Sequence, residues 1–501
     1  MAALISLLAL AAGLAGDAWG LSAAAVKVDI TPDPGRQRVY LSGFGATGRR
    51  AQGVHDPLYA RLLVLREGPR TLALAGLDLL GFYREDVDEL RRLAGFAGPD
   101  RYLLVAATHD HSGPDTMGLW GPLPGVSGKD AAYQRRVKER VAAALRDLES
   151  RLQEVSVTGW HGDLDPRGLC RDNRDPVVID PDLAALSFKD RRGRSVATVV
   201  NWSCHPEVLG PRNRQLTADY PGYLCDRVEK ETGGACLFLN GPIGGLLTPE
   251  TVPGRGGFAE ARRIGTTVAA AALRGLATAQ TKPGRPILAF RSRTVLVPVE
   301  NSRFLIFLPA LTFGHRLCDA CGRPMPRWKA YWLAIQHLFG RLRPEARPRV
   351  ETEVCVVDVG PARLLGMPAE VFPELVIGGY DGRFRGDHPL LKPDNPNPPD
   401  LKKAPRGPYL KELMSAAPPT HIPLFAGLAN DEIGYLVPDY DFKVQDSLLM
   451  LRRPPGDHYE ETNSIGPSAT HILLKEARRL LLEDAPMPSR LPEAELHRPA
   501  R

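Results

Sequence analysis

Short apolar runs alternate with amphipathic helical stretches along most of the 501-residue chain. The alternation is clearest where an apolar run at 70–81 is followed by charged, periodic residues at 84–96 and by a second apolar run at 102–107. Short apolar runs bounded by polar residues are typical of buried strands, and apolar positions three and four apart are typical of helices packed on them. We therefore expect a mixed α/β (α+β) fold with central β-sheets flanked by helices.

Further segments carry the same two patterns. Those with helical spacing are 131–152, 258–277 and 469–484. Those typical of strands are 194–203, 235–240 and 421–429, and a Gly-Pro turn within 353–367 predicts a hairpin. No internal repeat or long linker interrupts these patterns, so we expect one domain over 23–485.

Two segments have the composition of insertions into this domain. Segment 303–350 joins apolar stretches to many Arg residues and few acids, which fits either a helical pair covering the core or a basic, aromatic surface at a lipid interface. Segment 380–420 is rich in Pro, Lys and Asp, and it predicts a long loop of the kind that forms lids or binding elements.

The two ends of the chain differ from this domain. Residues 1–22 contain a Leu/Ala run followed by small residues, which predicts a signal peptide and an exported protein; the alternative is a buried N-terminal helix. We expect residues 486–501 to form a flexible tail. No later stretch has the ~20 apolar residues of a spanning helix, and a formal net charge of only +6 argues against a nucleic-acid partner.

Seven cysteines are scattered along the chain, which permits one or two disulfides after export but no disulfide-dense framework. The CDAC stretch at Cys318–Cys321 lacks the second Cys pair of a zinc knuckle. A local disulfide or two free thiols is therefore the preferred interpretation.

Two histidines one residue apart, His109 and His111, follow the predicted strand at 102–107. Side chains two apart point to the same face of a strand, so both imidazoles are expected to converge at its carboxyl end. On a helix the same spacing would separate them by about 200°. A pair of structural histidines is the alternative, but paired imidazoles at a strand end favour a metal or catalytic site.

Three other polar residues follow predicted strands: His205 in SCHPE, Glu370 in GMPAEVF and Tyr435 in GLANDEIGY. Singly, each has an ordinary explanation, since a Glu at a helix start often caps it and a Tyr in a Gly-rich loop often packs. Loops that leave strands are where α/β proteins assemble their sites. Together with His109, the three residues therefore predict one site.

Six separated motifs occur in the order seen in one family: THDHSGPD, NRDP, SCHPE…ADYPGY, GMPAEVF, GLANDEIGY and HYEETNSIGP. On these motifs the chain, over about residues 24–480, resembles the neutral/alkaline non-lysosomal ceramidases. The resemblance implies a zinc-dependent hydrolase that cleaves the amide bond of an N-acyl-sphingosine or a related N-acyl lipid. It implies one zinc ion per chain, in a site built from loops at strand ends and held by His109, His205, Glu370 and Tyr435.

The resemblance also implies roles for residues around the zinc ion. Arg174 and Tyr459 would face the scissile carbonyl and stabilise the oxyanion, and His111 would transfer a proton, with Asp110 as the lesser alternative. Zinc lowers the pKa of a bound water to about 7, which supplies hydroxide at neutral pH. The reference pKa of tyrosine is about 10, so Tyr435 would bind as phenolate only under the influence of the metal.

The chain departs from the family in two places. Members active on ceramide carry a glycine-rich turn ending in Asp-x-Ser-Pro, where this sequence has NGPIGGLLTP at 240–249, with Thr248 as the available hydroxyl. We also expect no C-terminal immunoglobulin-like domain. Both departures favour the zinc hydrolase class over ceramide itself as the substrate.

The sequence leaves three alternatives open. One is a zinc hydrolase of a different amide or ester. The second is a metal-dependent amidohydrolase on a TIM barrel, which also begins with His-x-His after a strand and would hold two metal ions. The third is a non-catalytic exported lipid-binding or adhesion protein with the same fold, which the complete ligand set argues against.

Overall fold

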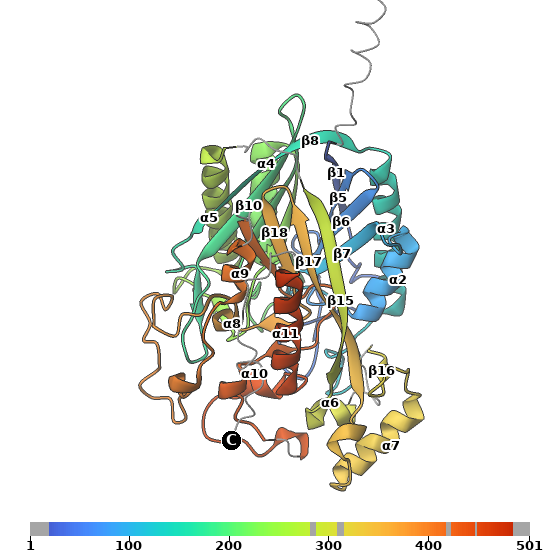
Figure 1. Cartoon of the computed structure of the whole chain (residues 1–501), viewed down its shortest axis with the longest axis vertical. Helices are drawn as coiled ribbons and strands as arrows, with labels where there is room; N and C mark the ends of the chain where they lie inside the picture. The colour runs from blue at the N-terminus through green and yellow to red at the C-terminus, as the bar shows by residue number, and fades with distance from the viewer. Residues whose placement is uncertain (1–19, 281–286, 308–314, 417–421, 446–447, 484–501) are drawn as a thin grey trace, which may run out of the picture.

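The computed structural model describes residues 20–280, 287–307, 315–416, 422–445 and 448–483. It confirms the expected mixed α/β fold, in which two β-sheets pack together and helices cover their outer faces (Figure 1). The expected tail at 486–501 lies outside the described residues, and so does the expected signal peptide apart from residues 20–22.

The larger sheet has eight strands in the order β13-β11-β10-β8-β1-β5-β6-β7. These strands are β1 (Ser22–Asp29), β5 (Tyr59–Glu67), β6 (Arg70–Leu77), β7 (Arg101–Ala107), β8 (Gln153–Asp163), β10 (Asp182–Asp190), β11 (Ser195–Trp202) and β13 (Ala235–Asn240). Only the β6–β7 and β11–β13 pairs are parallel. A parallel pair needs a crossover, and helices α2 (Arg84–Ala94) and α4 (Asp219–Thr232) provide the two crossovers. Since a TIM barrel has eight parallel strands, this sheet excludes it.

The smaller sheet has five strands, with β16 paired to β17 beside the order β15-β17-β18-β20. These strands are β15 (Leu288–Pro298), β16 (Leu317–Cys318), β17 (Arg349–Val359), β18 (Ala362–Gly366) and β20 (Ile422–Ala426). The expected hairpin is β17–β18, which turns at Gly360 and Pro361. Buried side chains of both sheets form one core cluster, with Leu63 and Leu104 from the larger sheet and Val357 from the smaller one.

Helices cover the outer faces of both sheets (Figure 1). The other helices that cover the sheets are α3 (Ala131–Glu149) and α5 (Gly257–Thr278) on the larger sheet, and α9 (Leu410–Ala416) and α11 (Ser468–Leu482) on the smaller one. Helix α3 shows why a helix begins at this point of the sequence. Asp130 caps it by accepting hydrogen bonds from the N–H groups of Ala132 and Tyr133. Its buried Val141 and Leu145 then pack on the sheet.

Short elements complete the described fold. They are β2 (Tyr40–Leu41), β3 (Arg49–Arg50), β4 (Gly53–Val54), β9 (Cys170–Asp172), β12 (Gln215–Leu216), β14 (Leu247–Pro249), β19 (Glu370–Val371), β21 (Tyr435–Leu436), α8 (Pro373–Ile377), α10 (Tyr459–Thr462), η3 (Asp439–Asp441) and η4 (Leu448–Met450). Several of them lie at the ends of longer strands and carry residues of the candidate site.

The two expected insertions have different structures. Segment 303–350 contains α6 (Ser302–Phe307), which begins one residue before it, then β16, α7 (Arg327–Leu338) and η1 (Pro344–Ala346). Part of the expected first helix, 308–314, lies outside the described residues. Segment 380–420 is irregular up to α9 apart from η2 (Leu401–Lys403), as its composition predicts.

All seven cysteines are free thiols, and six of them are buried. The disulfides that the sequence permits are therefore not formed, and CDAC contains two free thiols, buried Cys318 and exposed Cys321. Among the described residues, no helix combines the length and apolar character needed to cross a membrane.

Candidate metal centre

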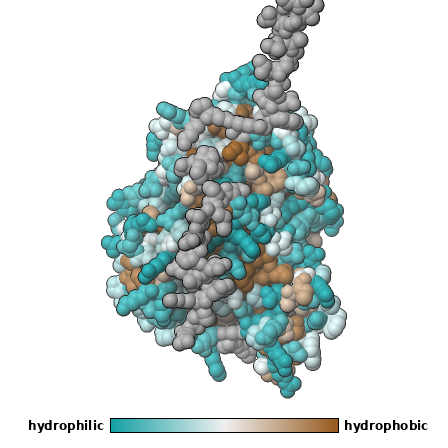
Figure 2. Space-filling model, viewed as in Figure 1, coloured by the Kyte–Doolittle hydropathy of each residue, from teal (hydrophilic) through white to brown (hydrophobic). Residues whose placement is uncertain are grey.

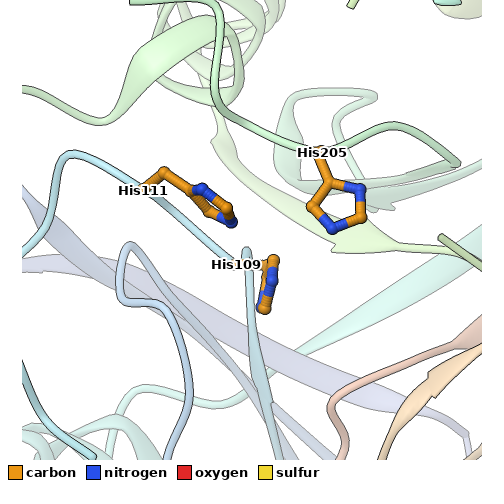
Figure 3. A group of neighbouring side chains, drawn as sticks. All are labelled: His109, His111 and His205. Atoms are coloured by element: carbon orange, nitrogen blue, oxygen red, sulfur yellow. The ribbon is translucent and has the colours of Figure 1, made fainter. Parts of the chain in front are cut away.

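Three buried imidazoles, those of His109, His111 and His205, meet beyond the carboxyl ends of β7 and β11 (Figure 3). One ligand nitrogen from each ring lies within 4.8 Å of the others. The ring centroid of His109 lies 5.0 Å from that of His111 and 5.1 Å from that of His205. The predicted convergence of His109 with His111, and of both with distant His205, is confirmed.

The convergence of His109 and His111 has a different cause from the one expected. β7 ends at Ala107, and His109 lies in the following loop with a left-handed φ of 69°. A non-glycine residue adopts this conformation only where its surroundings hold it. Here the His109 N–H donates a 3.0 Å hydrogen bond to the carbonyl of Leu79. The two imidazoles are therefore close together as predicted, but the loop conformation brings them together, not the alternation of side chains along a strand.

Backbone carbonyls orient two of the three imidazoles. His109 Nδ1 lies 3.0 Å from the carbonyl oxygen of Leu80, and His205 Nδ1 lies 2.8 Å from that of Leu247. A carbonyl oxygen only accepts, so Nδ1 carries the proton in both rings. The Nε2 atoms therefore face the space between the rings, which is the usual arrangement for metal-binding histidines.

Glu370 adds a carboxylate to this space. Its Oε2 lies 2.9 Å from His205 Nε2, and its Oε1 lies 3.5 Å from His109 Nε2. Tyr435 is the register partner of Glu370 in the β19–β21 pair, and its hydroxyl helps to lower the pKa of the Glu370 carboxyl. The structure thus brings together all four residues expected as ligands, and metal ligation by each of them stays a prediction.

Burial and the neighbouring charges set the protonation states of the site. Burial lowers the pKa of His109 to about 4 and the pKa of His111 well below its usual range, so both rings are neutral at pH 7. Burial alone would also lower the pKa of His205, but the hydrogen bond and charge of Glu370 raise it. Burial opposes ionisation of Glu370, yet His109 and His205 lower its pKa. The neutral imidazole of His109 and the ionised carboxylate of Glu370 are donors that suit Zn²⁺, and His205 would join them with its Nε2 deprotonated.

Glu207 is a site residue to which the sequence assigned no role. Its Oε2 lies 3.4 Å from His111 Nδ1, and its Oε1 accepts a 2.6 Å hydrogen bond from the Thr248 hydroxyl. Neither ring nitrogen of His111 has a hydrogen-bond partner within the described residues. The sequence did contain a signal for this role, because Glu207 lies only two residues after His205 in SCHPE. Thr248, the hydroxyl in the altered turn, therefore lies beside the site.

Gly43 makes room for His111. Its φ is 94°, and a Cβ built on it would lie 2.4 Å from His111 Cγ. Both the backbone conformation and the close approach therefore require glycine. The neighbouring Phe44 ring packs edge-on against the imidazole, with the centroids 4.9 Å apart. The position of Gly43, far from His111 in the sequence, gave no signal of this contact.

Asn240, the last residue of β13, links the two histidine loops. Its side-chain amide donates hydrogen bonds to the carbonyls of Thr108 and Cys204, both at 2.9 Å, and its carbonyl oxygen accepts from the Cys204 N–H at 3.2 Å. Thr108 precedes His109 and Cys204 precedes His205. One buried side chain thus fixes the positions of both loops.

Arg174 lies in a buried network of carboxylates. Its guanidinium lies 2.9 Å from Asp441, 2.8 Å from Glu460 and 2.8 Å from Glu461. Since Glu460 and Glu461 directly follow Tyr459 in α10, these ion pairs hold Tyr459 in place. The structure therefore assigns Arg174 a positioning role, and its contact with a substrate carbonyl stays a prediction.

Tyr459 lies beside the carboxylates of the site. Its ring centroid is 5.9 Å from that of Tyr435, and 44% of the residue is exposed. Partial burial raises its pKa, as do the charges of Glu370 and Glu207. The Asp110 side chain instead accepts from the Ser112 N–H within its own loop, at 2.8 Å.

Comparison with known proteins places this site in context. No family model matches the chain. Over 265 residues it is 25% identical to the neutral ceramidases of Pseudomonas aeruginosa and of Mycobacterium tuberculosis. These alignments cover 48% and 45% of this chain but only 39% and 41% of the two relatives, so the match spans about two fifths of their length.

The fold similarity extends further than the sequence similarity. The crystal structure of the Pseudomonas aeruginosa neutral ceramidase matches with a TM-score of 0.65 at 17% identity, over 93% of this chain and 74% of that one. The structure described as ceramidase complexed with C2 matches with a TM-score of 0.64 at 18% identity, over the same shares.

The fold and the site together define a two-sheet α/β protein with a buried centre of three histidines and one carboxylate. Within that class the chain is neutral ceramidase-like in both sequence and fold, as the motif order implied.

Proposed function

We propose that the chain is a zinc-dependent hydrolase that cleaves the amide bond of an N-acyl-sphingosine or a related N-acyl lipid. The observation that carries the proposal is the orientation of His109 and His205, whose Nε2 atoms face Glu370 while backbone carbonyls hold their Nδ1 atoms. The similarity to neutral ceramidases supports the reaction class. The described part of the chain contains a single cluster of side chains that could hold a metal ion, so we propose one ion per chain.

In this proposal His109, His205 and Glu370 hold the zinc ion, and Tyr435 either completes the ligand set or orients Glu370. A bound Zn²⁺ supplies Lewis-acid polarisation of a carbonyl group and hydroxide near neutral pH. An amide has a poor leaving group, so the protein must also supply a proton donor and stabilise the oxyanion.

His111 is the proposed proton carrier. Its ring is buried beside His109, and the Glu207 carboxylate faces its Nδ1 from 3.4 Å. A carboxylate in that position orients the imidazole and stabilises its protonated form, as in other acid–base pairs. His111 would take a proton from the attacking water and give it to the departing amine, and the Tyr459 hydroxyl would donate to the carbonyl oxygen as negative charge develops there.

A hydrolysis panel tests the function directly. N-acyl-sphingosines, N-acyl amino acids and simple esters are incubated with the protein, with and without a chelator, and the released amine or alcohol is measured. We expect chelator-sensitive release of an amine from an N-acyl lipid, with one metal ion per chain by elemental analysis. A metal-free protein that cleaves none of these substrates would support the non-catalytic alternative.

A different amide or ester is the second candidate substrate. It is favoured by the Glu207–Thr248 pair, because the family motif has Asp-x-Ser-Pro in this turn and the present chain does not. Preferential cleavage of N-acyl amino acids or esters in the same panel would select it.

Export is the remaining part of the proposal, supported by the composition of residues 1–22. N-terminal sequencing of the protein recovered from outside the cytoplasm tests it. A mature chain that begins near residue 23 is expected, and an uncleaved chain confined to the cytoplasm would contradict it.

A further inference from the structure

Helix α7 has apolar residues on both of its faces. Ala330, Leu333 and Ala334 are buried against the protein. The large apolar residues on the rest of the helix and just after it are between 40% and 71% exposed; they are Trp328, Tyr331, Trp332, Ile335, Leu338 and Phe339. Figure 2 shows tan and brown atoms at the lower right of the molecule, where Figure 1 places α7.

The exposed residues form a continuous stripe, which we call the α7 surface. Trp328, Trp332, Ile335 and Phe339 are spaced by four, three and four positions, so they follow one face of the helix. Six of the fourteen exposed large apolar residues in the described chain belong to this surface. An exposed cluster of this kind marks an interaction site, since folding alone gains nothing from it.

The charge around the α7 surface is strongly positive. Residues 316–349 contain eight Lys and Arg residues against two acidic ones, an excess of six that equals the formal net charge of the whole chain. The exposed cations are Arg316, Arg323, Lys329, Arg341 and Arg343. Within the described residues none of these five forms a salt bridge. Their charges are therefore available to an anionic partner.

We propose that the α7 surface docks the protein on a lipid bilayer that carries anionic headgroups. Trp and Tyr side chains favour the boundary between headgroups and acyl chains, and Lys and Arg beside them reach the phosphates. The 12 residues of α7 span about 18 Å at 1.5 Å per residue. This length is too short to cross a bilayer, so the helix lies in the plane of the interface.

The α7 surface is structurally connected to the candidate metal centre. Asn301, at the base of the insertion, donates hydrogen bonds to the carbonyls of Thr462 at 3.0 Å and Ser464 at 2.7 Å. Thr462 ends α10, whose first residue is Tyr459, and Figure 1 shows α6, α7 and α10 at the same end of the molecule. Docking through α7 would bring this end, with Tyr459, towards the bilayer.

Vesicle binding by the full chain tests the proposal without turnover, so it can fail independently of the proposed hydrolase activity. Vesicles of phosphatidylcholine alone, or of phosphatidylcholine with phosphatidylserine, are sedimented with the protein. We expect binding to the phosphatidylserine vesicles and a blue shift of tryptophan emission. The double substitution Trp328→Ala/Trp332→Ala should weaken the binding by about tenfold or more, because two indoles no longer enter the interface.

Two further variants complete the experiment. Leu123→Ala, the matched control, removes a 63%-exposed apolar residue outside the insertion and should bind as the wild type does. Arg341→Ala/Arg343→Ala should weaken binding to phosphatidylserine vesicles and reduce its dependence on salt. Circular dichroism and thermal unfolding confirm that each variant is folded.

Three results would overturn the proposal. The first is a wild-type chain that does not bind anionic vesicles at low salt. The second is a double tryptophan variant that binds as tightly as the wild type. The third is a wild-type dimer, without vesicles, that becomes a monomer on Trp328→Ala/Trp332→Ala, which would assign the α7 surface to a second copy of the chain.

Discussion

Glu370 and Tyr435 are register partners in the short parallel pair β19–β21, and the tyrosine hydroxyl helps to lower the pKa of the Glu370 carboxyl. On its other side the same carboxylate lies 2.9 Å from His205 Nε2. A pairing of two residues in each strand thus joins two segments that are far apart in the sequence. The strand pairing and the His205 contact both position the carboxylate, so its orientation is established by the protein before any metal binds.

Tyr435→Phe removes the hydroxyl and keeps the ring. We expect metal affinity to fall about 10- to 100-fold, the usual effect of losing a polar group that supports a metal ligand. Competition with a chromophoric chelator measures the affinity. Tyr459→Phe is the matched control and should bind the metal as the wild type does. Equal affinity in both variants would remove the Tyr435 hydroxyl from the metal site.

His205→Ala should abolish both metal binding and hydrolysis, because it removes one ligand and leaves Glu370 without its partner. His111→Ala should keep the metal and lower kcat by about 10²- to 10⁴-fold, the range for a lost acid–base group. Elemental analysis and kcat measurements separate the two effects, with exposed His471→Ala as the control. Full metal content in His205→Ala would contradict the ligand assignment, and metal loss in His111→Ala would make His111 a third histidine ligand.

Glu207→Gln keeps an acceptor for the Thr248 hydroxyl but removes the charge beside His111 Nδ1. We expect kcat to fall about 10- to 100-fold with unchanged metal content, because the imidazolium form of His111 loses its stabilising carboxylate. Thr248→Val should have a smaller effect, since the charge remains. If kcat is the same in Glu207→Gln as in the wild type, Glu207 has no part in proton transfer.

Asn240→Ala leaves the carbonyls of Thr108 and Cys204 without their donor in a buried site. We expect the free energy of unfolding to fall by about 2–4 kcal/mol, since each unpaired buried group costs about 1–3 kcal/mol. Asn240→Asp should be at least as destabilising, because it sets a carboxylate against two carbonyl oxygens. Denaturant unfolding measures both variants, and a loss below about 0.5 kcal/mol, typical of a neutral surface change, would show that the link between the loops is dispensable.

The buried ion pairs of Glu353, in β17, should make the free energy of unfolding depend on pH. It lies 2.5 Å from Arg84 and 2.7 Å from Arg91, and it accepts a 2.5 Å hydrogen bond from Tyr102. Burial alone would raise its pKa, but the two guanidinium groups lower the pKa below the usual 4.5. Because the folded-state pKa is the lower one, this stabilisation is fully present above the unfolded pKa and is lost as pH falls through the folded pKa.

The test compares Glu353→Gln with the wild type by urea unfolding. At pH 7 we expect a difference of about 3 kcal/mol, the scale for removing one partner of a buried ion pair. The difference should shrink progressively as the pH is lowered below about 4.5, where the unfolded-state carboxyl takes up its proton. A difference that is constant from pH 7 to pH 3 would contradict the ionic origin of the effect.

Hydrophobic periodicity located most of the elements around the site. The helix expected over 84–96 is α2, and the hairpin expected over 353–367 is β17–β18. Burial of one face imposes such periodicity locally, so it is visible in the sequence. The strand expected over 70–81 was too long: β6 ends at Leu77, and the loop beyond it gives the Leu80 carbonyl to His109. An apolar run in the sequence does not show that one of its backbone carbonyls accepts a hydrogen bond from a distant side chain and so does not belong to the strand.

The sequence by itself determined the fold class and indicated that His109, His205 and Glu370 belong to one candidate site, because side-chain chemistry and motif order are properties of the chain. Only the tertiary structure decided how these residues are held. Gly43, Glu207 and Asn240 act across loops that become neighbours when β7, β11 and β13 assemble. The distance between two such loops depends on the packing of the strands beneath them, and no local pattern in either loop encodes it.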